Sequence, residues 1–390
     1  MSSTTERWYW LDWLRVIAMG LIFLYHCGRP FIFIPWHITN PGPPDMAFTI
    51  ANIFMTGWIM PLFFTVSGIA TYFSLSRRSP GQYAKSRFLR LMVPFIFAMF
   101  VVILPVHSYF DAVFNGSYTG SFIDYYFWIY FLYAFPLDLV PRLTYFAGAN
   151  QGIYLWYLFW LFVFSLITVY FFKYLRGKED KISKLARICN RRGGIFLLAI
   201  PLIMVDLAAI PPFFVFPSGY GGWKLPTYLI FFILAYVVAS DSKFIQSIDK
   251  NGLIALIVGI ITSLLIIGVF GAFGLDIFVS PTGYLIATPL WAFNGWCWIV
   301  AILFLGRKFL NFNHKFLSLS NELVLPFYIL HQTVIVVVAF FVVGMTTIVM
   351  VKYLIIVFAA FVIISLLLIP IRQINVFRFL FGLRLKKKSA

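Results

Sequence analysis

The chain has 390 residues, of which 62% are hydrophobic and only 11% are charged. This composition excludes a soluble globular domain, and the repeated apolar runs of about twenty residues are long enough to cross a bilayer as helices. The net charge of +17 does not indicate a nucleic-acid partner, because all but four of the thirty Lys and Arg residues fall on the side of the membrane that we assign as cytoplasmic. An excess of basic residues on the cytoplasmic side is typical of a membrane protein. The basic residues that we assign to the outside are Arg29, Arg142, Lys224 and Lys352.

The first apolar run, residues 10–34, begins a series of ten predicted membrane-spanning helices. It lacks the short apolar core and small-residue cleavage site of a signal peptide, so we interpret it as a retained helix. A basic cytoplasmic turn that ends at Arg90 precedes the third span, in which Pro94 and Pro105 can kink the helix. The later spans are residues 47–75, 91–114, 152–172, 193–211, 225–240, 253–273, 284–305, 323–343 and 348–371.

This pattern predicts an all-α, multi-pass integral membrane helical bundle of about ten transmembrane helices, with both termini cytoplasmic. We expect residues 1–390 to form a single transmembrane domain, with a basic cytoplasmic tail at about residues 372–390. The sequence shows no inverted repeat of the kind found in many transporters. We also expect no metal cofactor, because the cysteines form neither a metal-ligand pattern nor a disulfide framework. They are Cys27, Cys189 and Cys297.

Four ionisable side chains lie in the first span, where charged groups are costly and indicate function. They are Asp12, Arg15, His26 and Arg29. Arg15 and His26 are eleven positions apart, close to three helical turns, so they share one face and lie roughly 16 Å apart along the axis. Arg29 lies near the outer interface, where its side chain can reach water. We therefore expect Asp12, Arg15 and His26 to form a functional site that faces the protein interior.

Four motifs in order resemble those of the acyltransferase-3 family. The stretch LDWLRVIAMGLIFLYHCG, residues 11–28, is similar to the family's opening helix, whose signature is Arg, ten residues and then His. PLFFTVSG, RFLRLMVP and LPFYILHQTVIV resemble the motifs of the second helix, the first cytoplasmic loop and the penultimate helix; they are residues 61–68, 87–94 and 325–336. The tripeptide PWH at residues 35–37 resembles the branch of the family that modifies periplasmic glucans.

The resemblance implies a membrane O-acyltransferase that moves an acyl group, acetyl or succinyl, from cytoplasmic acyl-CoA to a hydroxyl. The acceptor would be an extracytoplasmic or lipid-linked glycan, and the protein would lie in the cytoplasmic membrane of a bacterium. Its partners would be acyl-CoA, the glycan and membrane lipids, with no nucleic acid.

His26 is the predicted base or transient acyl carrier, because a buried imidazole stays neutral and can accept a proton or attack a thioester. The alternative is a core histidine bonded to a neighbouring helix. Arg15 either binds the phosphate or pantetheine region of CoA or forms an ion pair with Asp12, three positions earlier. An ion pair would not exclude a role in organising the site.

Arg87 and Arg90 can hold CoA phosphates with their guanidinium groups. Alternatively, they only keep this loop on the cytoplasmic side of the membrane and contact anionic lipids. Ser67 can line the acyl path, although Ser67 and Gly68 also suit close helix packing. Tyr328 joins these residues in the predicted acyl-CoA site.

His331, one turn after Tyr328, either orients substrate, relays a proton or is a structural histidine. Asp206 and His107 are weaker candidates; an acid such as Asp206 could orient His26.

Two other functions remain open. A proton-coupled secondary transporter or flippase would use the ionisable residues of the first helix as a relay, and it would transport without acyl-CoA. A non-catalytic membrane scaffold would need those residues only for stability.

Overall fold

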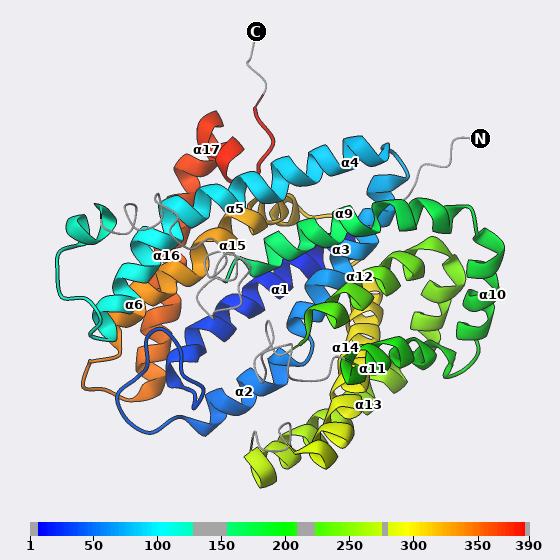
Figure 1. The fold of residues 1–390 in the computed structure, drawn as a ribbon, viewed down its shortest axis with the longest axis horizontal. Helices are drawn as coiled ribbons and strands as arrows, with labels where there is room; N and C mark the ends of the chain where they lie inside the picture. Colours follow the sequence, from blue (N-terminus) through cyan, green and yellow to red (C-terminus); the bar gives the residue numbers. More distant parts are fainter. Residues whose placement is uncertain (1–6, 128–153, 209–222, 275–279, 387–390) are drawn as a thin grey trace. The chain divides into compact units, whose positions relative to one another are not determined.

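Every regular element among the described residues is helical, so the all-α prediction is confirmed (Figure 1). The computed structural model describes residues 7–127, 154–208, 223–274 and 280–386. The elements are α1 (Tyr9–Gly28), η1 (Arg29–Phe31), α2 (Met46–Thr56), α3 (Ile59–Leu75), α4 (Pro80–Arg87), η2 (Phe88–Met92), α5 (Val93–Ala98), η3 (Met99–His107), α6 (Ser108–Phe114), α9 (Trp156–Arg176), α10 (Glu179–Cys189), η4 (Gly194–Leu198), α11 (Ala199–Ala208), α12 (Leu225–Ser240), α13 (Ser242–Phe273), α14 (Pro281–Phe309), α15 (Lys315–Val342), α16 (Val349–Gln373) and α17 (Asn375–Leu380).

Eight helical segments in the described part of the chain are long and apolar enough to cross a membrane. The predicted fifth and sixth spans correspond to two shorter apolar helices, Gly194–Ala208 and Leu225–Ser240. The multi-pass prediction is therefore confirmed, with eight crossings supported by length and composition. Arg142, the start of the predicted fourth span and the end of the fifth lie outside the described residues.

The predicted basic turn before the third span is present only at residues 76–79; its continuation to Arg90 is wrong, because the chain is helical from Pro80 onward. The helix begins at Pro80, whose missing N–H costs nothing at a first turn. Ser79 and Gln82 form a reciprocal cap: the backbone N–H of Gln82 donates to the Ser79 hydroxyl (3.3 Å), and the backbone N–H of Ser79 donates to Oε1 of Gln82 (3.1 Å). These local bonds start a helix in a segment that hydropathy alone marks as polar.

π-Helical turns accommodate the two prolines of this segment. The turn η2 directly precedes α5, where Pro94 is in the first turn, and η3 contains Pro105. A wider turn relieves the clash that a proline ring makes with the preceding turn of an α-helix. The helical segment continues from Pro80 to Phe114.

The chain forms two compact units. Unit 1 comprises Met1–Ala18, Ile53–Tyr83 and Phe164–Asn321, and unit 2 comprises Met19–Asn52, Ala84–Val163 and Glu322–Ala390.

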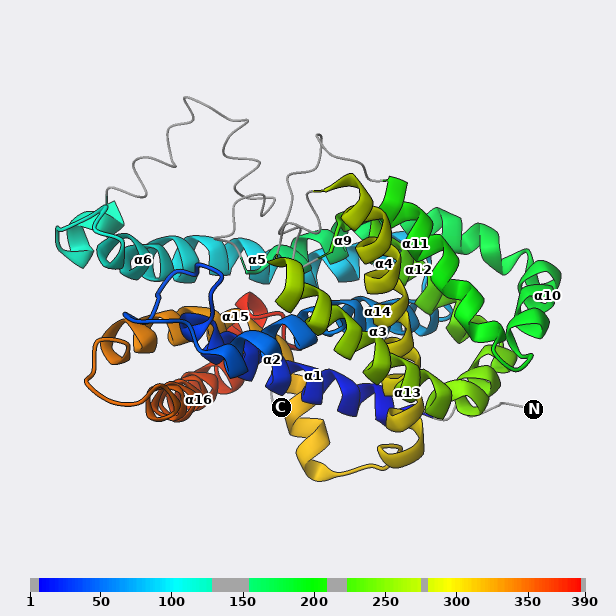
Figure 2. The same cartoon turned by 90° about the horizontal axis from the view of Figure 1, so that it is seen from below.

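Close helix pairs build unit 1. Helix α3 packs along α12, and α13 lies beside α14 (Figures 1 and 2). Gly68 of α3 permits this approach: a Cβ atom there would lie 2.7 Å from the Cβ atom of Ala235 and closer still to the carbonyl oxygen of Phe232. The prediction that Gly68 serves close packing is confirmed. Between α13 and α14, the side-chain amide of Asn294 donates to the Gly259 carbonyl (3.0 Å) and the Thr262 hydroxyl (2.7 Å).

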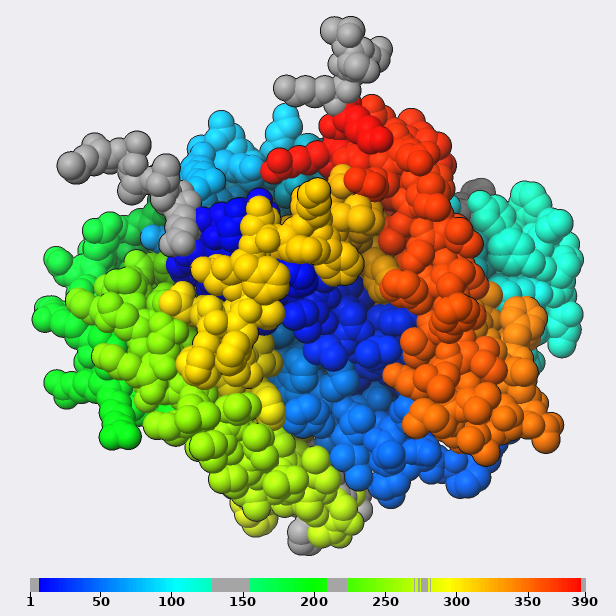
Figure 3. Space-filling model, turned by 180° about the vertical axis from the view of Figure 1, so that it is seen from behind, coloured from blue at the N-terminus to red at the C-terminus, as the bar shows by residue number. Residues whose placement is uncertain are grey.

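Unit 2 includes the second half of α1, the loop that follows η1, the segment from α5 to α6, most of α15, and α16. Phe23 of α1 contacts Phe327 of α15, with ring centroids 5.5 Å apart. Large apolar side chains of α16 are exposed, among them Leu354, Phe358 and Phe361, and Figure 3 shows this helix at the surface in orange to red. Such a face suits contact with lipid chains.

Candidate active site

Four of the five histidines of the chain come together in unit 2. His26 lies in the last turns of α1, His37 in the loop after η1, His107 at the end of η3, and His331 in α15. The ring centroids of His26 and His331 are 5.2 Å apart, and those of His37 and His107 are 4.3 Å apart. The structure thus brings the predicted catalytic histidines together and adds a second imidazole pair.

Two aromatic side chains connect these histidine pairs. The Trp36 ring lies 6.2 Å from that of His26 and 5.3 Å from that of His37. The Tyr154 ring lies 5.7 Å from His107 and 5.5 Å from His331. The six rings form a closed cycle, which we call the histidine cluster.

The hydrogen bonds of His331 fix its tautomer. His331 is fully buried, and its Nδ1 atom lies 2.6 Å from the backbone carbonyl oxygen of Tyr328. A carbonyl oxygen only accepts hydrogen bonds, so Nδ1 carries the proton of a neutral ring and Nε2 keeps its lone pair. The Tyr328 hydroxyl donates to the Tyr154 carbonyl (2.6 Å), and the Tyr154 hydroxyl donates to the Ile329 carbonyl (2.5 Å). The tyrosine bonds fix the side chains beside His331, and the bond from its own Nδ1 holds the ring and leaves Nε2 able to accept a proton.

Five ring nitrogens of the histidine cluster are buried and lack a hydrogen-bond partner among the described residues. They are His26 Nδ1, His37 Nε2, both nitrogens of His107, and His331 Nε2. Buried polar atoms in proteins are nearly always paired, and an unpaired one costs about 1–3 kcal/mol. A concentration of such atoms is typical of a site that binds polar groups of a substrate.

A carboxylate faces the second imidazole pair. Oδ1 of Asp111, on α6, lies 3.4 Å from Nδ1 of His37. The His37 side chain is only 9% exposed, whereas the Asp111 side chain is 34% exposed. The carboxylate favours a proton on Nδ1, so the lone pair of the neutral His37 ring is again on Nε2.

The loop between η1 and α2 is anchored at both ends and in the middle. The Asn40 N–H donates to the Pro30 carbonyl (2.8 Å), and the Asp45 N–H donates to the Phe31 carbonyl (2.7 Å). The buried ammonium group of Lys352, on α16, donates to Oδ1 of Asn40 (2.8 Å). These bonds hold the loop that carries the tryptophan and one histidine of the cluster.

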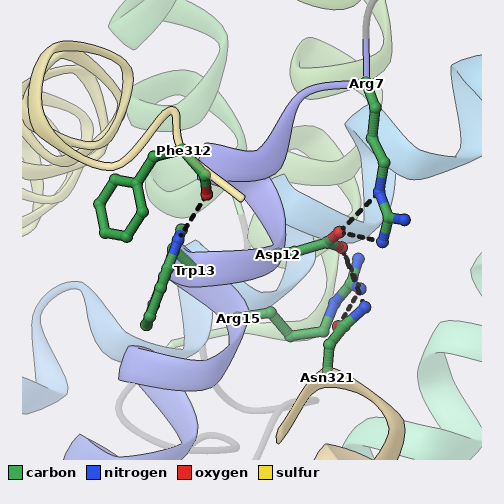
Figure 4. A network of polar contacts seen from close by, with 6 residues as sticks. All are labelled: Arg7, Asp12, Trp13, Arg15, Phe312 and Asn321. Atoms are coloured by element: carbon green, nitrogen blue, oxygen red, sulfur yellow. Dashed lines mark hydrogen bonds and ion pairs between the residues drawn. The ribbon is translucent and has the colours of Figure 1, made fainter. Parts of the chain in front are cut away.

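Arg15 and Asp12 belong to a polar network in unit 1 (Figure 4). Nη1 of Arg15 lies 3.5 Å from Oδ1 of Asp12 and donates to Oδ1 of Asn321 (3.0 Å). Arg7 donates to the other carboxylate oxygen of Asp12 through Nε (3.2 Å) and Nη2 (2.7 Å). The ion pair that the spacing allowed is therefore present, and Asp12 is paired with two cations.

The remaining candidate residues are divided between the two units. Arg87 and Arg90 are in unit 2, at the end of α4 and within η2, and the Arg90 side chain is exposed. Ser67 lies in unit 1, directly before Gly68 in α3.

Asp206 is also in unit 1, where the Thr227 hydroxyl donates to its carboxylate (2.9 Å). Its backbone carbonyl accepts hydrogen bonds from the Lys224 ammonium group and from the Tyr284 hydroxyl (2.8 Å). Asp206 is thus part of a polar cluster in unit 1. Its hypothetical role as the acid that orients His26 gains no support from these partners.

No group of three or more His, Cys, Asp or Glu side chains in the described part of the chain is arranged to hold a metal ion.

The sequence did not reveal three members of the site: His37, Asp111 and Tyr154. The PWH tripeptide that ends at His37 was a usable signal, because it places an imidazole in a proline-rich loop. Asp111 follows His107 by four positions and thus lies one helical turn later.

Comparison with known proteins identifies the family. A family model described as an acyltransferase domain matches residues 8–370. The chain belongs to the acyltransferase-3 family. The sequence-based prediction of this family is confirmed, and the protein is a multi-pass membrane protein of an acyltransferase family.

Similar curated proteins include two named glucans biosynthesis protein C, both from Escherichia coli. The protein from O6:K15:H31 (strain 536 / UPEC) is 25% identical over 184 residues, and that from strain SMS-3-5 / SECEC is 24% identical over 179 residues. Each match covers 46% of this chain and 42% of the relative, so the chain spans less than half of the length of these relatives. No solved structure matches the chain.

Proposed function

We propose that the protein is an O-acyltransferase that moves an acetyl or succinyl group from cytoplasmic acyl-CoA to a hydroxyl of an extracytoplasmic or lipid-linked glycan. Membership of the acyltransferase-3 family supports the reaction class. The name of the Escherichia coli relatives supports a glucan as acceptor, and we propose the cytoplasmic membrane of a bacterium as the location. Residues 1–390 would act as one transmembrane domain.

The observation that carries the proposal is the buried pair of His26 and His331. Forming an ester from a thioester needs a base for the hydroxyl proton or a nucleophile that carries the acyl group. Each ring has a buried nitrogen without a partner among the described residues, and the tautomer of His331 leaves Nε2 basic. His26 would accept the proton or carry the acyl group, and His331 would orient substrate or relay the proton, with Tyr328 holding its ring.

Arg87 and Arg90 would bind the phosphates of CoA, since guanidinium groups form bidentate hydrogen bonds with phosphate oxygens. Both residues are in the same unit as the histidine cluster. Arg15, with Asp12, would organise the donor end of the first helix, and Ser67 would line the acyl path.

The test is transfer of radiolabelled acetyl or succinyl from acyl-CoA to glucose oligosaccharides by the purified protein in liposomes. His26→Ala should abolish transfer, whereas His314→Ala, at an exposed position, should not. The same assay gives the KM for acyl-CoA, which Arg87→Gln and Arg90→Gln should raise and the exposed control Lys85→Gln should not. Full transfer by folded His26→Ala would refute the assignment. Movement of the glycan across the membrane without acyl-CoA would favour a transporter.

A further inference from the structure

The pair of His37 and Asp111 has the geometry of an oriented base. Asp111 lies 3.4 Å from Nδ1 of His37, on the side of the ring opposite to Nε2. A carboxylate in that position holds the imidazole in the tautomer whose Nε2 accepts a proton, and it stabilises the imidazolium that forms. Nε2 of His37 is buried and has no partner among the described residues.

The surroundings of His37 match those of the predicted catalytic pair. The ring of His107 meets that of His37 edge-on, at an interplanar angle of 87°, and both nitrogens of His107 are buried without a described partner. Trp36 connects His37 to His26, and its ring lies at 24° to the plane of His26. An aromatic face next to a base is a common platform for a sugar ring, because the apolar face of a sugar packs on it.

We propose that His37 is a further catalytic residue, the base that takes the proton of the acceptor hydroxyl, and that Asp111 is its positioning residue. This proposal rests on the proposed function and deepens it: it assigns the acceptor side of the reaction to His37. His26 then keeps the other role proposed for it, which is to carry the acyl group, and His331 orients the substrate.

The step balances with the groups named. An imidazole nitrogen of His26 bonds to the acyl carbon, the bond from that carbon to sulfur breaks, and the electron pair leaves on the CoA thiolate. The acceptor hydroxyl oxygen then bonds to the acyl carbon while its proton passes to Nε2 of His37, and the bond from the acyl carbon to His26 breaks, which restores the neutral imidazole. The thiolate takes a proton from water, and His37 returns its proton to water past Asp111, which is 34% exposed. The products are the ester and free CoA.

The test compares transfer of radiolabelled acyl groups to glucose oligosaccharides by purified variants in liposomes. His37→Gln keeps a polar side chain of similar reach but cannot accept the proton, so kcat should fall by about 100-fold or more while the KM for acyl-CoA stays the same. Asp111→Asn should lower kcat by about tenfold, since the amide favours the wrong tautomer at a partly exposed site. Asp111→Glu should restore most of it.

Two further measurements separate catalysis from structure. Added imidazole should restore part of the activity of His37→Gly, which a merely structural histidine would not allow. Asp124→Asn is the matched control, because Asp124 is an exposed carboxylate that accepts a hydrogen bond from the Ser121 hydroxyl (2.6 Å), and it should keep wild-type kcat.

The outcomes are distinct for the two proposals. If the wild-type protein transfers no acyl group from acyl-CoA, the proposed function is wrong. If the wild type transfers but His37→Gln matches it, only the role of His37 is overturned. If His37→Gln does not fold, the Asp111 variants decide. The role of His37 as a base is overturned if kcat is the same for Asp111→Asn, Asp111→Glu and the wild type.

Discussion

Replacement of Arg15 by alanine separates a structural ion pair from a role in the reaction. This change removes, among the contacts of Arg15, a hydrogen bond to Asn321 and a long ion pair of 3.5 Å with Asp12. Asp12 stays neutralised by Arg7, at 2.7 Å. A hydrogen bond contributes about 1 kcal/mol, and an ion pair that reaches solvent contributes about 0–1 kcal/mol. The loss of these two contacts should therefore destabilise the protein by about 1–2 kcal/mol.

Activity should fall further if Arg15 organises the acyl-CoA end of the site. A hydrogen bond to a charged group contributes about 1.5–3 kcal/mol, which corresponds to a loss of roughly 10- to 150-fold in kcat/KM. The matched control is Arg307→Ala in the same unit. Arg307 forms a bidentate ion pair with Asp249: Nε donates to Oδ1 (3.0 Å) and Nη2 donates to Oδ2 (3.1 Å). Its loss should lower stability by a similar amount and leave kcat/KM unchanged.

Thermal unfolding in detergent measures the stability of both arginine variants, and the liposome transfer assay measures their kcat/KM. If Arg15→Ala and Arg307→Ala both unfold slightly earlier and both transfer acyl groups at the wild-type rate, Arg15 is a structural residue and its assignment to the donor end is wrong.

Three further variants test the packing and the site. Gly68→Ala should destabilise the protein by about 1–3 kcal/mol, because the new Cβ atom would collide with Ala235. Gly20→Ala should stabilise it by about 0.5–1 kcal/mol, since nothing lies within 4 Å of a Cβ atom there; thermal unfolding that shows the same sign for both would contradict this. His107→Leu should raise the unfolding temperature while it lowers acyl transfer, because it removes two buried, unpaired nitrogens. If His107→Leu unfolds at a lower temperature than the wild type, the two nitrogens of His107 do not destabilise the folded protein and this reasoning is wrong.

Hydropathy predicted the centres of the helices well and their polar ends poorly. The bounds of α12 agree with the predicted span at residues 225–240. Helices α13 and α15 begin at Ser242 and Lys315, about two to three turns before the predicted spans. Their first turns are polar, and a helix continues through polar residues as long as its backbone hydrogen bonds are made. An apolar run marks where lipid lies, whereas backbone bonding decides where a helix begins.

The candidate site was predictable in part for a related reason. His26 and His331 stood out because each is an ionisable group within an apolar run. His37 lies in a polar loop, where a histidine carries no such signal. Its partner Asp111 is more than seventy positions away along the chain, and no helical period relates two residues in separate segments. Only the folded chain brings them within 3.4 Å.

The histidine cluster is too costly to be explained as part of the core. At about 1–3 kcal/mol each, five buried and unpaired nitrogens would cost as much as the net stability of a typical domain, about 5–15 kcal/mol. Buried nitrogens of this kind are stabilised when water or the polar groups of a bound molecule hydrogen-bond to them. A scaffold would be more stable with apolar residues at these positions, whereas an enzyme acting on a polyhydroxylated acceptor needs them to hold hydroxyls and take a proton. The unpaired nitrogens therefore favour the proposed substrate site at the cluster, and this observation does not depend on the motif around Arg15 and His26.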